Sequence, residues 1–580
     1  MTGQHNREFQ LGCLVEASRS GFGGEGEPAG CSGILLGEGL VLTHASLLLT
    51  SLSEAEFSAL HKSGTLPSRV LNDINIEVSL ERMSPEDSDV LPTKAIQPRL
   101  DLNAVKPEVP KHYTALFGVS SRSSGEPTVH KVSGDILQIW KADKFAKVLR
   151  RVLPSSEGWS FVESNDAKEM GEDIQQNINL LIPYFLLLKL DNMNLKSDVT
   201  PHRGPLHKGQ KVWCMGSPFG NLCPPVFLNC VSQGIVGNLA GPSNEVILTD
   251  ARCIPGSEGG AVFIPTPQGR EVAGMIVAPL CWKTNEWVGL TIACSLTEIL
   301  SSLRNSLSYA ASSMISVPAI MKSKMSAAGS DLVVSDLDLL RSTEDNDLKL
   351  TQFPSVCLIQ CEGSWGSGVL LDDKGTILTC SHVVKFKKSS QVYVSFPERA
   401  PDVEMKARVV VCSSTKEVFD VAILRIKNFK MNKNLFTPVK VAVPRNGMKV
   451  VTAGHGCFGV DKELSPTLTQ GRIAKVVKVG PSPVIIQSSC AVHAGASGGA
   501  LLTPEGGLVG ILTCNSRDTE TGASYPHVNM SVPVATIWPH IQNYLKTEDE
   551  IHLKSLTLQN TEAADLWGLR ASLGATKSKL

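Results

Sequence analysis

The sequence predicts an all-β protein that contains two related double β-barrel units in tandem, each closed by a helix at its C-terminal end. Short apolar runs are separated by turns rich in Gly, Pro, Asn and Asp, which is typical of antiparallel sheets. A series of short motifs occurs twice in the same order, which indicates an internal repeat. The length of 580 residues also exceeds what one hydrophobic core accommodates, because a domain averages about 150 residues.

Four matched segments define the repeat. Apolar runs followed by a threonine begin each copy, a Gln-Gly pair recurs later, and a longer stretch then aligns without a gap. Any β-rich sequence shows some of this similarity by chance, but that alternative weakens with each match that keeps the order. The matched segments are 32–43 and 367–379, 186–190 and 422–426, 231–235 and 468–473, and 247–261 and 486–500.

Each copy ends with an apolar pattern of helical period. Residues spaced three and four apart share one face of a helix, so we expect a closing helix after the last strand of each unit. The residues on this face are Leu296, Ile299, Leu300, Leu303 and Leu307 in the first unit and Ile537, Trp538, Ile541, Tyr544 and Leu545 in the second.

Composition marks the boundaries of the units. We expect a first unit over 1–308, a linker over 309–350 where Ser, Ala, Met and acidic residues accumulate, and a second unit over 351–546. The stretch near 100–176 has no counterpart in the second copy and is rich in Lys, Glu and Pro, so we expect a surface insertion there. Residues 547–580 are expected to form a polar tail.

The second unit contains a serine nucleophile and the two side chains that would activate it. Ser497 lies in the sequence Gly-Ala-Ser-Gly-Gly, His382 follows an apolar strand, and Asp420 precedes another one. A serine hydroxyl needs an imidazole to take its proton and a carboxylate to orient that imidazole. The order His, Asp, Ser along the chain is that of the chymotrypsin-type hydrolases. Taken singly, each motif is more often a turn, a structural histidine or a strand edge, whereas their combination is specific.

The glycines around the serine indicate how the loop would stabilise the reaction. They allow the backbone N–H groups of Gly495 and Ser497 to point at one developing oxyanion. Each such donor stabilises the transition state by about 3 kcal/mol. Cys380 and Cys490 lie near the expected site, but neither occupies the glycine-bracketed position of the loop, so a cysteine nucleophile is disfavoured. This chemistry requires no cofactor and no metal ion, and we expect neither.

The first unit lacks the catalytic side chains when the two copies are aligned. We therefore predict that it is a degenerate, inactive copy. A local shift of one or two residues could bring in Ser257 and His44, but no carboxylate accompanies this pair. The aligned positions hold Glu258 opposite Ser497, Ser46 opposite His382, and Tyr184 opposite Asp420.

Charge and cysteine content exclude several classes of protein. The chain has 55 Lys and Arg residues against 56 Asp and Glu residues and no basic cluster, so we expect no nucleic-acid and no membrane-surface partner. Its longest apolar run, Ile178–Leu190, contains Pro183 and is shorter than the roughly 20 residues of a spanning helix. The 15 cysteines are odd in number and scattered, without the close pairs of a zinc site, so we expect reduced thiols.

The second unit, over about 352–545, resembles the protease domain of the HtrA/Deg family. This resemblance implies a trypsin-like serine endopeptidase with His382 as general base, Asp420 as its orienting acid and Ser497 as nucleophile. The matching motifs are Gly366-Ser367-Gly368, Leu378-Thr379-Cys380-Ser381-His382-Val383-Val384, Phe419-Asp420-Val421-Ala422-Ile423-Leu424 and Gly495-Ala496-Ser497-Gly498-Gly499-Ala500-Leu501.

The chain ends in Ser578-Lys579-Leu580, which is the receptor-read address of the peroxisome matrix. With this ending and a degenerate first copy, the whole chain resembles the peroxisomal and glyoxysomal processing branch of these proteases. The resemblance implies an enzyme that removes N-terminal targeting presequences from imported matrix proteins, cuts preferentially after Cys, and processes enzymes of fatty-acid β-oxidation. It also implies protein substrates and the peroxisomal import receptor as partners, autocatalytic cleavage, and self-association into a homodimer.

The segments expected to line the S1 pocket agree with such a specificity. In this fold the pocket is built from 489–494, just before the nucleophile, and 512–515, on the strand after it. Neither segment contains Asp or Glu, so a neutral pocket should favour a small or apolar residue such as Cys and reject Arg. An alternative function is a protease-like chaperone or substrate-binding scaffold of the peroxisome matrix, which the degenerate first unit alone would support.

Overall fold

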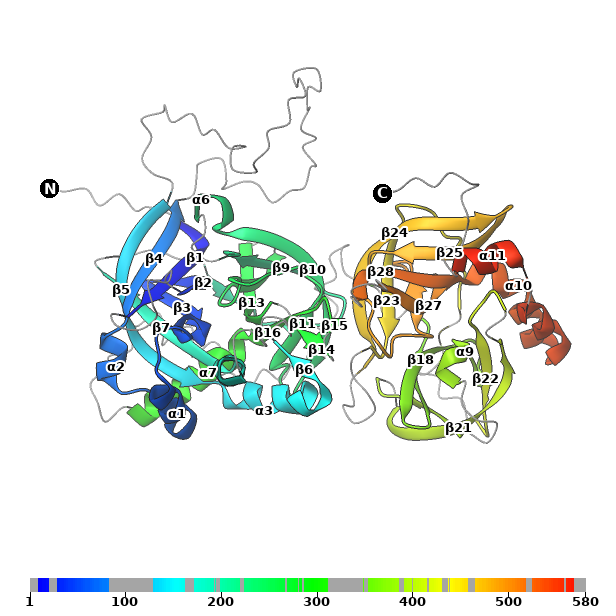
Figure 1. Ribbon diagram of the computed structural model, residues 1–580, viewed down its shortest axis with the longest axis horizontal. Helices are drawn as coiled ribbons and strands as arrows, with labels where there is room; N and C mark the ends of the chain where they lie inside the picture. Colours follow the sequence, from blue (N-terminus) through cyan, green and yellow to red (C-terminus); the bar gives the residue numbers. More distant parts are fainter. Residues whose placement is uncertain are drawn as a thin grey trace, which may run out of the picture.

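A computed structural model gives the fold of the chain, and Figure 1 shows two lobes side by side, the first half in blue to green and the second in yellow-green to red. The structure describes residues 9–19, 29–82, 129–161, 172–191, 193, 199–219, 224–266, 269–279, 281–283, 286–310, 348, 353–384, 391–398, 400–414, 417–429, 437, 439–456, 465–517, 524–557 and 560–567.

The first half begins with a closed antiparallel barrel of six strands. Its strands follow the order β1-β2-β3-β7-β5-β4 around the barrel. The bounds are β1 (Phe9–Ser18), β2 (Ala29–Gly37), β3 (Leu40–His44), β4 (Asn75–Arg82), β5 (Val129–Lys141) and β7 (Tyr184–Leu190).

A second sheet completes the first half. Its order is β12-β9-β10-β11-β16-β13-β8, and an additional β12–β13 pairing closes a ring to which β8 is attached. The bounds are β8 (Thr200–Pro201), β9 (Lys211–Gly216), β10 (Cys230–Ala240), β11 (Val246–Thr249), β12 (Ala261–Thr266), β13 (Gly269–Ala278) and β16 (Thr291–Ser295). A small sheet in the order β15-β14-β6 is formed by β6 (Trp159–Ser160), β14 (Trp282–Lys283) and β15 (Glu286–Trp287).

The second half contains two closed barrels with the same arrangement. Their orders are β17-β18-β19-β22-β21-β20 and β23-β24-β25-β28-β27-β26. The first is made of β17 (Val356–Cys361), β18 (Ser364–Leu370), β19 (Thr376–Thr379), β20 (Val392–Phe396), β21 (Ala400–Cys412) and β22 (Ala422–Ile426). The second is made of β23 (Lys449–Gly454), β24 (Thr467–Val479), β25 (Ser482–Ser488), β26 (Ala500–Leu502), β27 (Leu508–Arg517) and β28 (Ser524–Pro533).

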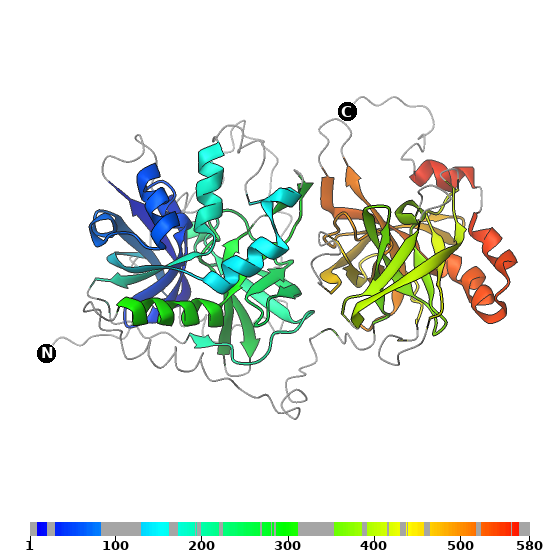
Figure 2. The ribbon, with the colours of Figure 1, turned by 90° about the horizontal axis from the view of Figure 1, so that it is seen from below.

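Helices cover the outside of the barrels, and Figure 2 shows the red helices of the C-terminal region on the side of the second half that faces away from the first. In the part of the chain that the structure describes, no helix has the length and apolar character needed to cross a bilayer. The helices are η1 (Ala45–Leu48), α1 (Glu54–Ser63), α2 (Ser68–Asn72), α3 (Asp143–Val152), η3 (Ser155–Glu157), α5 (Glu172–Leu181), α6 (Pro224–Phe227), α7 (Leu296–Ala310), α9 (Ser381–Val384), α10 (Val534–Thr547), η7 (Glu550–Thr557) and α11 (Thr561–Trp567).

Local sequence explains several of these elements. In β20 buried positions alternate with half-buried ones, as expected for a strand with one face on the core, whereas β19 is buried along its whole length because other elements cover both faces. Helix α1 begins at a capping box in which Ser53 and Glu56 satisfy each other's backbone N–H groups. Helix α10 turns Ile537, Ile541 and Tyr544 into the core.

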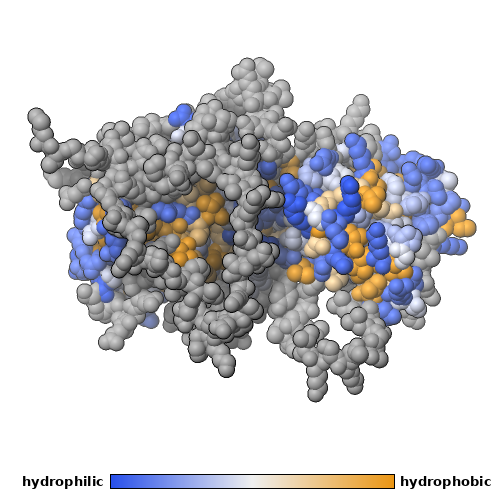
Figure 3. Space-filling view, turned by 90° about the horizontal axis from the view of Figure 1, so that it is seen from above, coloured by the Kyte–Doolittle hydropathy of each residue, from blue (hydrophilic) through white to orange (hydrophobic). Residues whose placement is uncertain are grey.

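The predicted fold class is confirmed, because two tandem double-barrel units are present, and α7 and α10 follow their last strands. The register of the strands also agrees with the repeat. Thr43 pairs with Leu186 in the first half, and the aligned residues Thr379 and Ala422 pair in the second. Figure 3 shows hydrophobic and hydrophilic residues interspersed over the visible face of the second half.

The structure corrects the expected insertion near 100–176. Strand β5 lies between β4 and β7 in the barrel, the position that β21 takes between β20 and β22. Residues 129–141 therefore have a counterpart in the second half. The sequence obscured it because β5 is separated from β4 by a long stretch of chain. The part of the insertion over 100–128 lies outside the described residues, as do 162–171.

The tail expected over 547–580 is also partly folded. Leu553 and Leu556 of η7 and Ala563 of α11 are buried in the core of the second half. The indole N–H of Trp567 donates a hydrogen bond of 3.2 Å to the carbonyl of Val484. Ser578, Lys579 and Leu580 lie outside the described residues, as does the expected linker apart from 309–310, which end α7, and residue 348.

Candidate active site

His382 and Asp420 are brought together by the pairing of two neighbouring strands. Strand β19 pairs with β22 so that Thr379 lies opposite Ala422. His382 follows the end of β19 within α9, and Asp420 precedes the start of β22, so both side chains lie at the same end of the strand pair. The side chain of His382 is 48% exposed and that of Asp420 is 28% exposed, so a substrate can reach the imidazole.

The carboxylate of Asp420 is held by three donors. His382 Nδ1 contacts Asp420 Oδ2, while the other oxygen, Oδ1, accepts hydrogen bonds from the hydroxyl of Ser381 and, at 3.0 Å, from the backbone N–H of His382. Burial opposes ionisation of Asp420, but the hydrogen bonds from His382 and Ser381 outweigh it, so the pKa of this carboxyl is lowered. Asp420 is therefore a stable anion that fixes the imidazole with Nε2 turned outward.

Ser381 is a residue of this site that the sequence analysis missed. It lies in the matched motif, but serine has no obligatory role beside a histidine, so the pattern gave no signal for its hydroxyl. The aligned residue in the first half is Ala45, which cannot make this hydrogen bond.

Ser497 lies where the two barrels of the second half meet. Its carbonyl accepts a 2.8 Å hydrogen bond from the N–H of Ser367. Position 498 requires glycine, because a Cβ there would lie 2.1 Å from the carbonyl oxygen of Ser367. The hydroxyl of Ser497 donates to the carbonyl of Thr513 at 3.0 Å. In this structure its partner is thus Thr513 rather than the imidazole of His382.

Strand β27 connects the serine loop with the end of β19 that carries His382. The carbonyl of Leu512 accepts from the N–H of Gly498 at 2.7 Å and from the thiol of Cys380 at 3.1 Å. Thr513, next to Leu512, accepts the hydroxyl of Ser497. The loop of the predicted nucleophile and Cys380, two residues before His382, therefore contact the same two residues of β27.

The loop before Ser497 is shaped by a tight turn. The N–H of Ala496 donates to the carbonyl of His493 at 3.0 Å, and Gly495 has a φ of 91°, a conformation that favours glycine. A Cβ on Gly495 would also lie 2.3 Å from Nε1 of Trp365. The hydroxyl of Ser367 fixes the carbonyl side of Gly495, to which it donates at 2.9 Å.

The first half repeats this scaffold but carries a carboxylate in place of the hydroxyl. The carbonyl of Glu258 accepts a 2.8 Å hydrogen bond from the N–H of Ser32, as Ser497 does from Ser367. The Glu258 carboxylate then accepts a 2.7 Å hydrogen bond from the N–H of Gly256, the residue aligned with Gly495. Since Gly256 has nearly the same φ, 93°, its N–H indicates the direction of the corresponding donor beside Ser497.

The two residues that could have replaced the lost triad are structural. His44 is buried, with Nε2 2.9 Å from the carbonyl oxygen of Ile182 and Nδ1 accepting from the N–H of Ser46. Burial lowers the pKa of His44 to about 4, so the ring is neutral. Ser257 is buried too. Tyr184, the residue aligned with Asp420, donates its hydroxyl hydrogen to the carbonyl oxygen of Leu60.

Known proteins resemble the chain both over its second half and over nearly its whole length. The trypsin-like peptidase domain matches residues 366–511. The mouse protein named peroxisomal leader peptide-processing protease is 31% identical over 98% of this chain and 98% of its own, and the human protein of that name gives the same values. The chloroplastic Protease Do-like 1 of Arabidopsis thaliana is 33% identical over 30% of this chain and 37% of its own.

The chain belongs to the family of the peroxisomal leader peptide-processing proteases. The resemblance inferred from the sequence is thereby confirmed. Since the matching domain is that of trypsin-like peptidases and the relatives are proteases, the chain is a serine peptidase of the trypsin-like class.

Cys380, the cysteine beside His382 and Asp420, is held in its protonated form. The 13 cysteines among the described residues are all free. Cys380 is buried, and burial, followed by the nearby Asp420, raises the pKa of its thiol well above the usual value. Cys380, His382 and Asp420 form the one group in the described part of the chain with metal-ligand atoms within 4.8 Å of one another. The protonated thiol and the His–Asp contact favour proton transfer over metal binding there.

The walls expected for the S1 pocket are neutral where the structure describes them. Cys490, Ala491 and Val492 are buried, and the side chain of Asn529 donates to the carbonyl of Cys490 at 2.8 Å. His527 Nδ1 lies 3.2 Å from the carbonyl oxygen of Ser489. The side chain of residue 515 lies outside the described part.

Proposed function

We propose that this chain is a serine endopeptidase of the peroxisome matrix that uses His382, Asp420 and Ser497 as its catalytic triad. The observation that carries the proposal is the His382–Asp420 contact at the end of a strand pair that shares Leu512 and Thr513 with the Ser497 loop. The peroxisomal assignment follows from the Ser-Lys-Leu ending and from the names of the relatives.

The mechanism follows from the roles of these groups. The hydroxyl of Ser497 turns from Thr513 toward His382 and attacks the scissile carbonyl, while Nε2 of His382 takes its proton. Asp420 orients the imidazole and stabilises the imidazolium. The N–H groups of Gly495 and Ser497 donate to the oxyanion. His382 then returns the proton to the leaving amine, and a water molecule hydrolyses the acyl-enzyme by the same route.

The substrates are imported matrix proteins with N-terminal presequences, as the name of the relatives suggests. We propose cleavage after Cys because the described walls of the S1 pocket carry no acid to pair with a basic side chain. Enzymes of fatty-acid β-oxidation are further substrates, and the import receptor binds the Ser-Lys-Leu ending. Autocatalytic cleavage and a homodimer complete the proposal.

The division of the chain into domains is also part of the proposal. We propose a degenerate unit over 1–308, a linker over 309–350, an active protease unit over 351–546 and a C-terminal targeting segment that ends the region 547–580. The Glu258 carboxylate in the loop of the first unit supports its inactivity.

The deciding experiment compares the wild-type protein with Ser497→Ala. Each is incubated with a presequence-bearing matrix enzyme, and the product is read by N-terminal sequencing. We expect a new N-terminus after a Cys with the wild type alone. A fluorophosphonate probe should label the wild type and leave Ser497→Ala unlabelled. Equal products from both proteins contradict the nucleophile, and an unlabelled, inactive wild type supports a chaperone or scaffold instead.

A further inference from the structure

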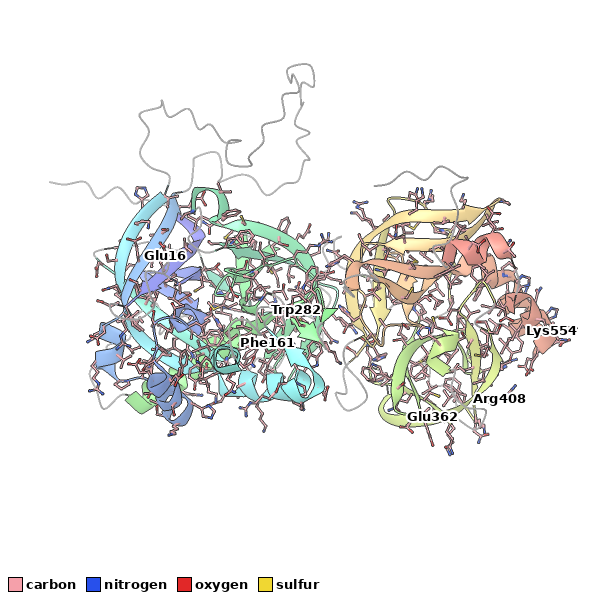
Figure 4. The ribbon with its side chains drawn as sticks, in the orientation of Figure 1. Glu16, Phe161, Trp282, Glu362, Arg408 and Lys554 are labelled. Atoms are coloured by element: carbon pink, nitrogen blue, oxygen red, sulfur yellow. The ribbon has the colours of Figure 1, made fainter. Side chains whose placement is uncertain are left out.

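The two halves meet beside the loop that precedes Ser497. Figure 1 shows the small sheet of β14 and β15 on the side of the first half that faces the second, and Figure 4 labels Trp282 there. Away from this hairpin, the carboxylate of Asp250 accepts from the N–H of Gln470 at 2.5 Å, and the side chain of Asn238 donates to the carbonyl of Ser465 at 3.0 Å. Asp250 and Asn238 are buried, so the contact between the halves is extensive and partly polar.

His493 is the first point at which the first half contacts this loop. Its side chain lies against the carbonyl of Val288, the residue after β15, and donates its Nε2 hydrogen to it. His493 is 8% exposed, and its own carbonyl accepts the N–H of Ala496 in the turn that carries Gly495. Burial lowers the pKa of His493 to about 4, which keeps the ring neutral with one N–H to donate. A backbone group of the first half thus holds one end of this turn.

Lys283 of β14 reaches the same turn from another side. Its ammonium nitrogen lies 5.1 Å from the centre of the Trp365 ring and 5.0 Å from that of Trp159, so it connects an aromatic ring of each half. The indole N–H of Trp365 donates to the carbonyl of His455 at 3.2 Å. Trp365 also fills the space beside Gly495, where a Cβ would lie 2.3 Å from its Nε1. The Trp365 ring therefore lies against both Lys283 and Gly495.

Trp287 of β15 supports the neighbouring wall of the expected S1 pocket. Its ring centre lies 5.3 Å from that of His527, and the planes are inclined by 60°. His527 in turn contacts the carbonyl of Ser489. The hairpin region of the first half thus contacts the segment before Ser497 directly at His493 and indirectly, through His527, at Ser489.

The corresponding loop of the first half shows what the same turn looks like without such a partner. The residue aligned with His493 is Ile254, which is 37% exposed, compared with 8% for His493. In the first half the Glu258 carboxylate accepts the N–H of Gly256 and ties the turn from within. Ser497 has no carboxylate with which to do this. The turn that presents Gly495 is instead held by residues outside the loop, by Ser367 of the same half at the Gly495 carbonyl and by the first half at His493.

We infer that the first half is an intramolecular activator, in which the β14–β15 hairpin holds the oxyanion turn of the second half through His493, Lys283 and Trp287 as positioning residues. This inference rests on the proposed role of Ser497 and the N–H of Gly495. An oxyanion donor acts in the transition state, so its misplacement lowers kcat more than it raises KM.

The test uses the full chain and a fluorogenic peptide with Cys at P1. We expect His493→Leu and Lys283→Met each to lower kcat about tenfold with KM within twofold, because loss of one oxyanion donor lowers kcat by about 100-fold or more and misplacement by less. His493→Gln retains an N–H for the Val288 carbonyl and should recover most of the lost kcat. The matched control is Ile254→Leu at the same loop position of the first half, which should leave kcat unchanged.

The outcomes separate this inference from the proposed function. Active sites are titrated with the fluorophosphonate, so kcat refers to folded protein, and Lys283→Met carries the test if His493→Leu does not fold. Unchanged kcat in Lys283→Met and in the folded His493 variants overturns the inference, as does a loss confined to KM. Activity that is equal in wild type and Ser497→Ala, or absent in both, overturns the proposed function and the inference with it.

Discussion

The carboxylate of Glu258 accepts a 2.7 Å hydrogen bond from the backbone N–H of Gly256, at the place where a working protease of this fold would bind the oxyanion of its substrate. Burial raises the pKa of Glu258, although the backbone N–H groups of Glu258 and Gly256 oppose that shift. The first half therefore retains the shape of an oxyanion loop, but the side chain of Glu258 occupies that loop.

Restoring a serine to this loop should not restore activity. In a Ser497→Ala background, we expect Glu258→Ser to remain unlabelled by a fluorophosphonate, because His44 is buried against Ile182 and Ser46 stands where an imidazole is needed. The positive control is the protein with Ser497 intact. Stoichiometric labelling of the variant would show that the first half still activates a serine.

The anchoring of Asp420 should be measurable through Ser381. Asp420→Asn is expected to lower kcat about 10⁴-fold, because an amide stabilises the wrong imidazole tautomer. Ser381→Ala removes one donor from the carboxylate and leaves the contact with His382, so we expect a loss of about tenfold, or roughly 1.4 kcal/mol. Measuring kcat per titrated active site for both variants, with one peptide substrate, tests whether the loss is larger in Asp420→Asn than in Ser381→Ala. A Ser381→Ala enzyme with wild-type kcat would contradict it.

Much of this site could be predicted from the sequence, for reasons that particular residues make clear. His382 and Asp420 flank strands with strong apolar patterns, so strand pairing alone brings them together. Ser497 lies among glycines whose lack of a Cβ is required by close backbone contacts, as at Gly498. The repeat aligns Glu258 with Ser497, and the structure agrees, because the carbonyls of both residues accept equivalent 2.8 Å hydrogen bonds from the N–H groups of Ser32 and Ser367.

The remainder depends on contacts that leave no local pattern. Strand β5 falls within the expected insertion, because its place in the barrel depends on pairing with strands far along the chain. The contact of His493 with the carbonyl of Val288 joins residues 205 positions apart, and a backbone carbonyl has no sequence signature. Folding of the tail depends on Leu553 and Leu556, which are too few to form a clear helical period in the sequence.

Stability should fall in acid partly because of His44. The pKa of His44 in the folded protein is about 4, below the usual value of 6.5, so the unfolded chain takes up the proton first as the pH falls. The contribution of neutral His44 to the free energy of unfolding is on the order of 3 kcal/mol. It is complete above about pH 6.5 and is lost progressively as the pH falls toward 4. His44→Gln keeps an N–H for Ile182 and should lack this dependence. Urea unfolding of both proteins at pH 7 and pH 4.5 tests it.

Comparing the wild type with His44→Gln isolates the contribution of His44 to the pH dependence of stability. Burial raises the pKa of Asp250 to about 6, which shifts stability in the opposite direction over the same range, but it does so equally in both proteins. The same pH dependence in wild type and His44→Gln would contradict the assignment.

Cleavage specificity should exclude basic residues. Peptides that differ only by Cys, Ala or Arg at P1 are expected to be cleaved in the order Cys, Ala, Arg, with kcat/KM for Arg lower by about 100-fold or more. The reason is that the described walls, including Ala491 and Val492, offer no acid to a buried guanidinium. Mass spectrometry of the products gives the bond cleaved and the rates. A preference for Arg would mean that an acid from elsewhere in the chain enters the pocket.

The sharpest test of the oxyanion turn uses two serines with matching hydrogen bonds. Ser367 accepts from the N–H of His455 at 2.8 Å and donates to the carbonyl of Gly495 at 2.9 Å. Ser32 accepts from the N–H of Ser217 at 2.7 Å and donates to the carbonyl of Gly256 at 2.7 Å. Each hydroxyl is buried, so replacing either with alanine should lower the free energy of unfolding by about 1–3 kcal/mol.

The two variants should differ in catalysis alone. Ser367→Ala loosens the carbonyl side of Gly495, whose N–H is the proposed oxyanion donor, so we expect kcat to fall about tenfold with little change in KM. Ser32→Ala loosens the same turn around Gly256, where Glu258 and not a substrate is bound, and should leave kcat unchanged. Equal losses of kcat would attribute the effect to general destabilisation, whereas a loss limited to Ser367→Ala assigns it to the geometry of the turn beside Ser497.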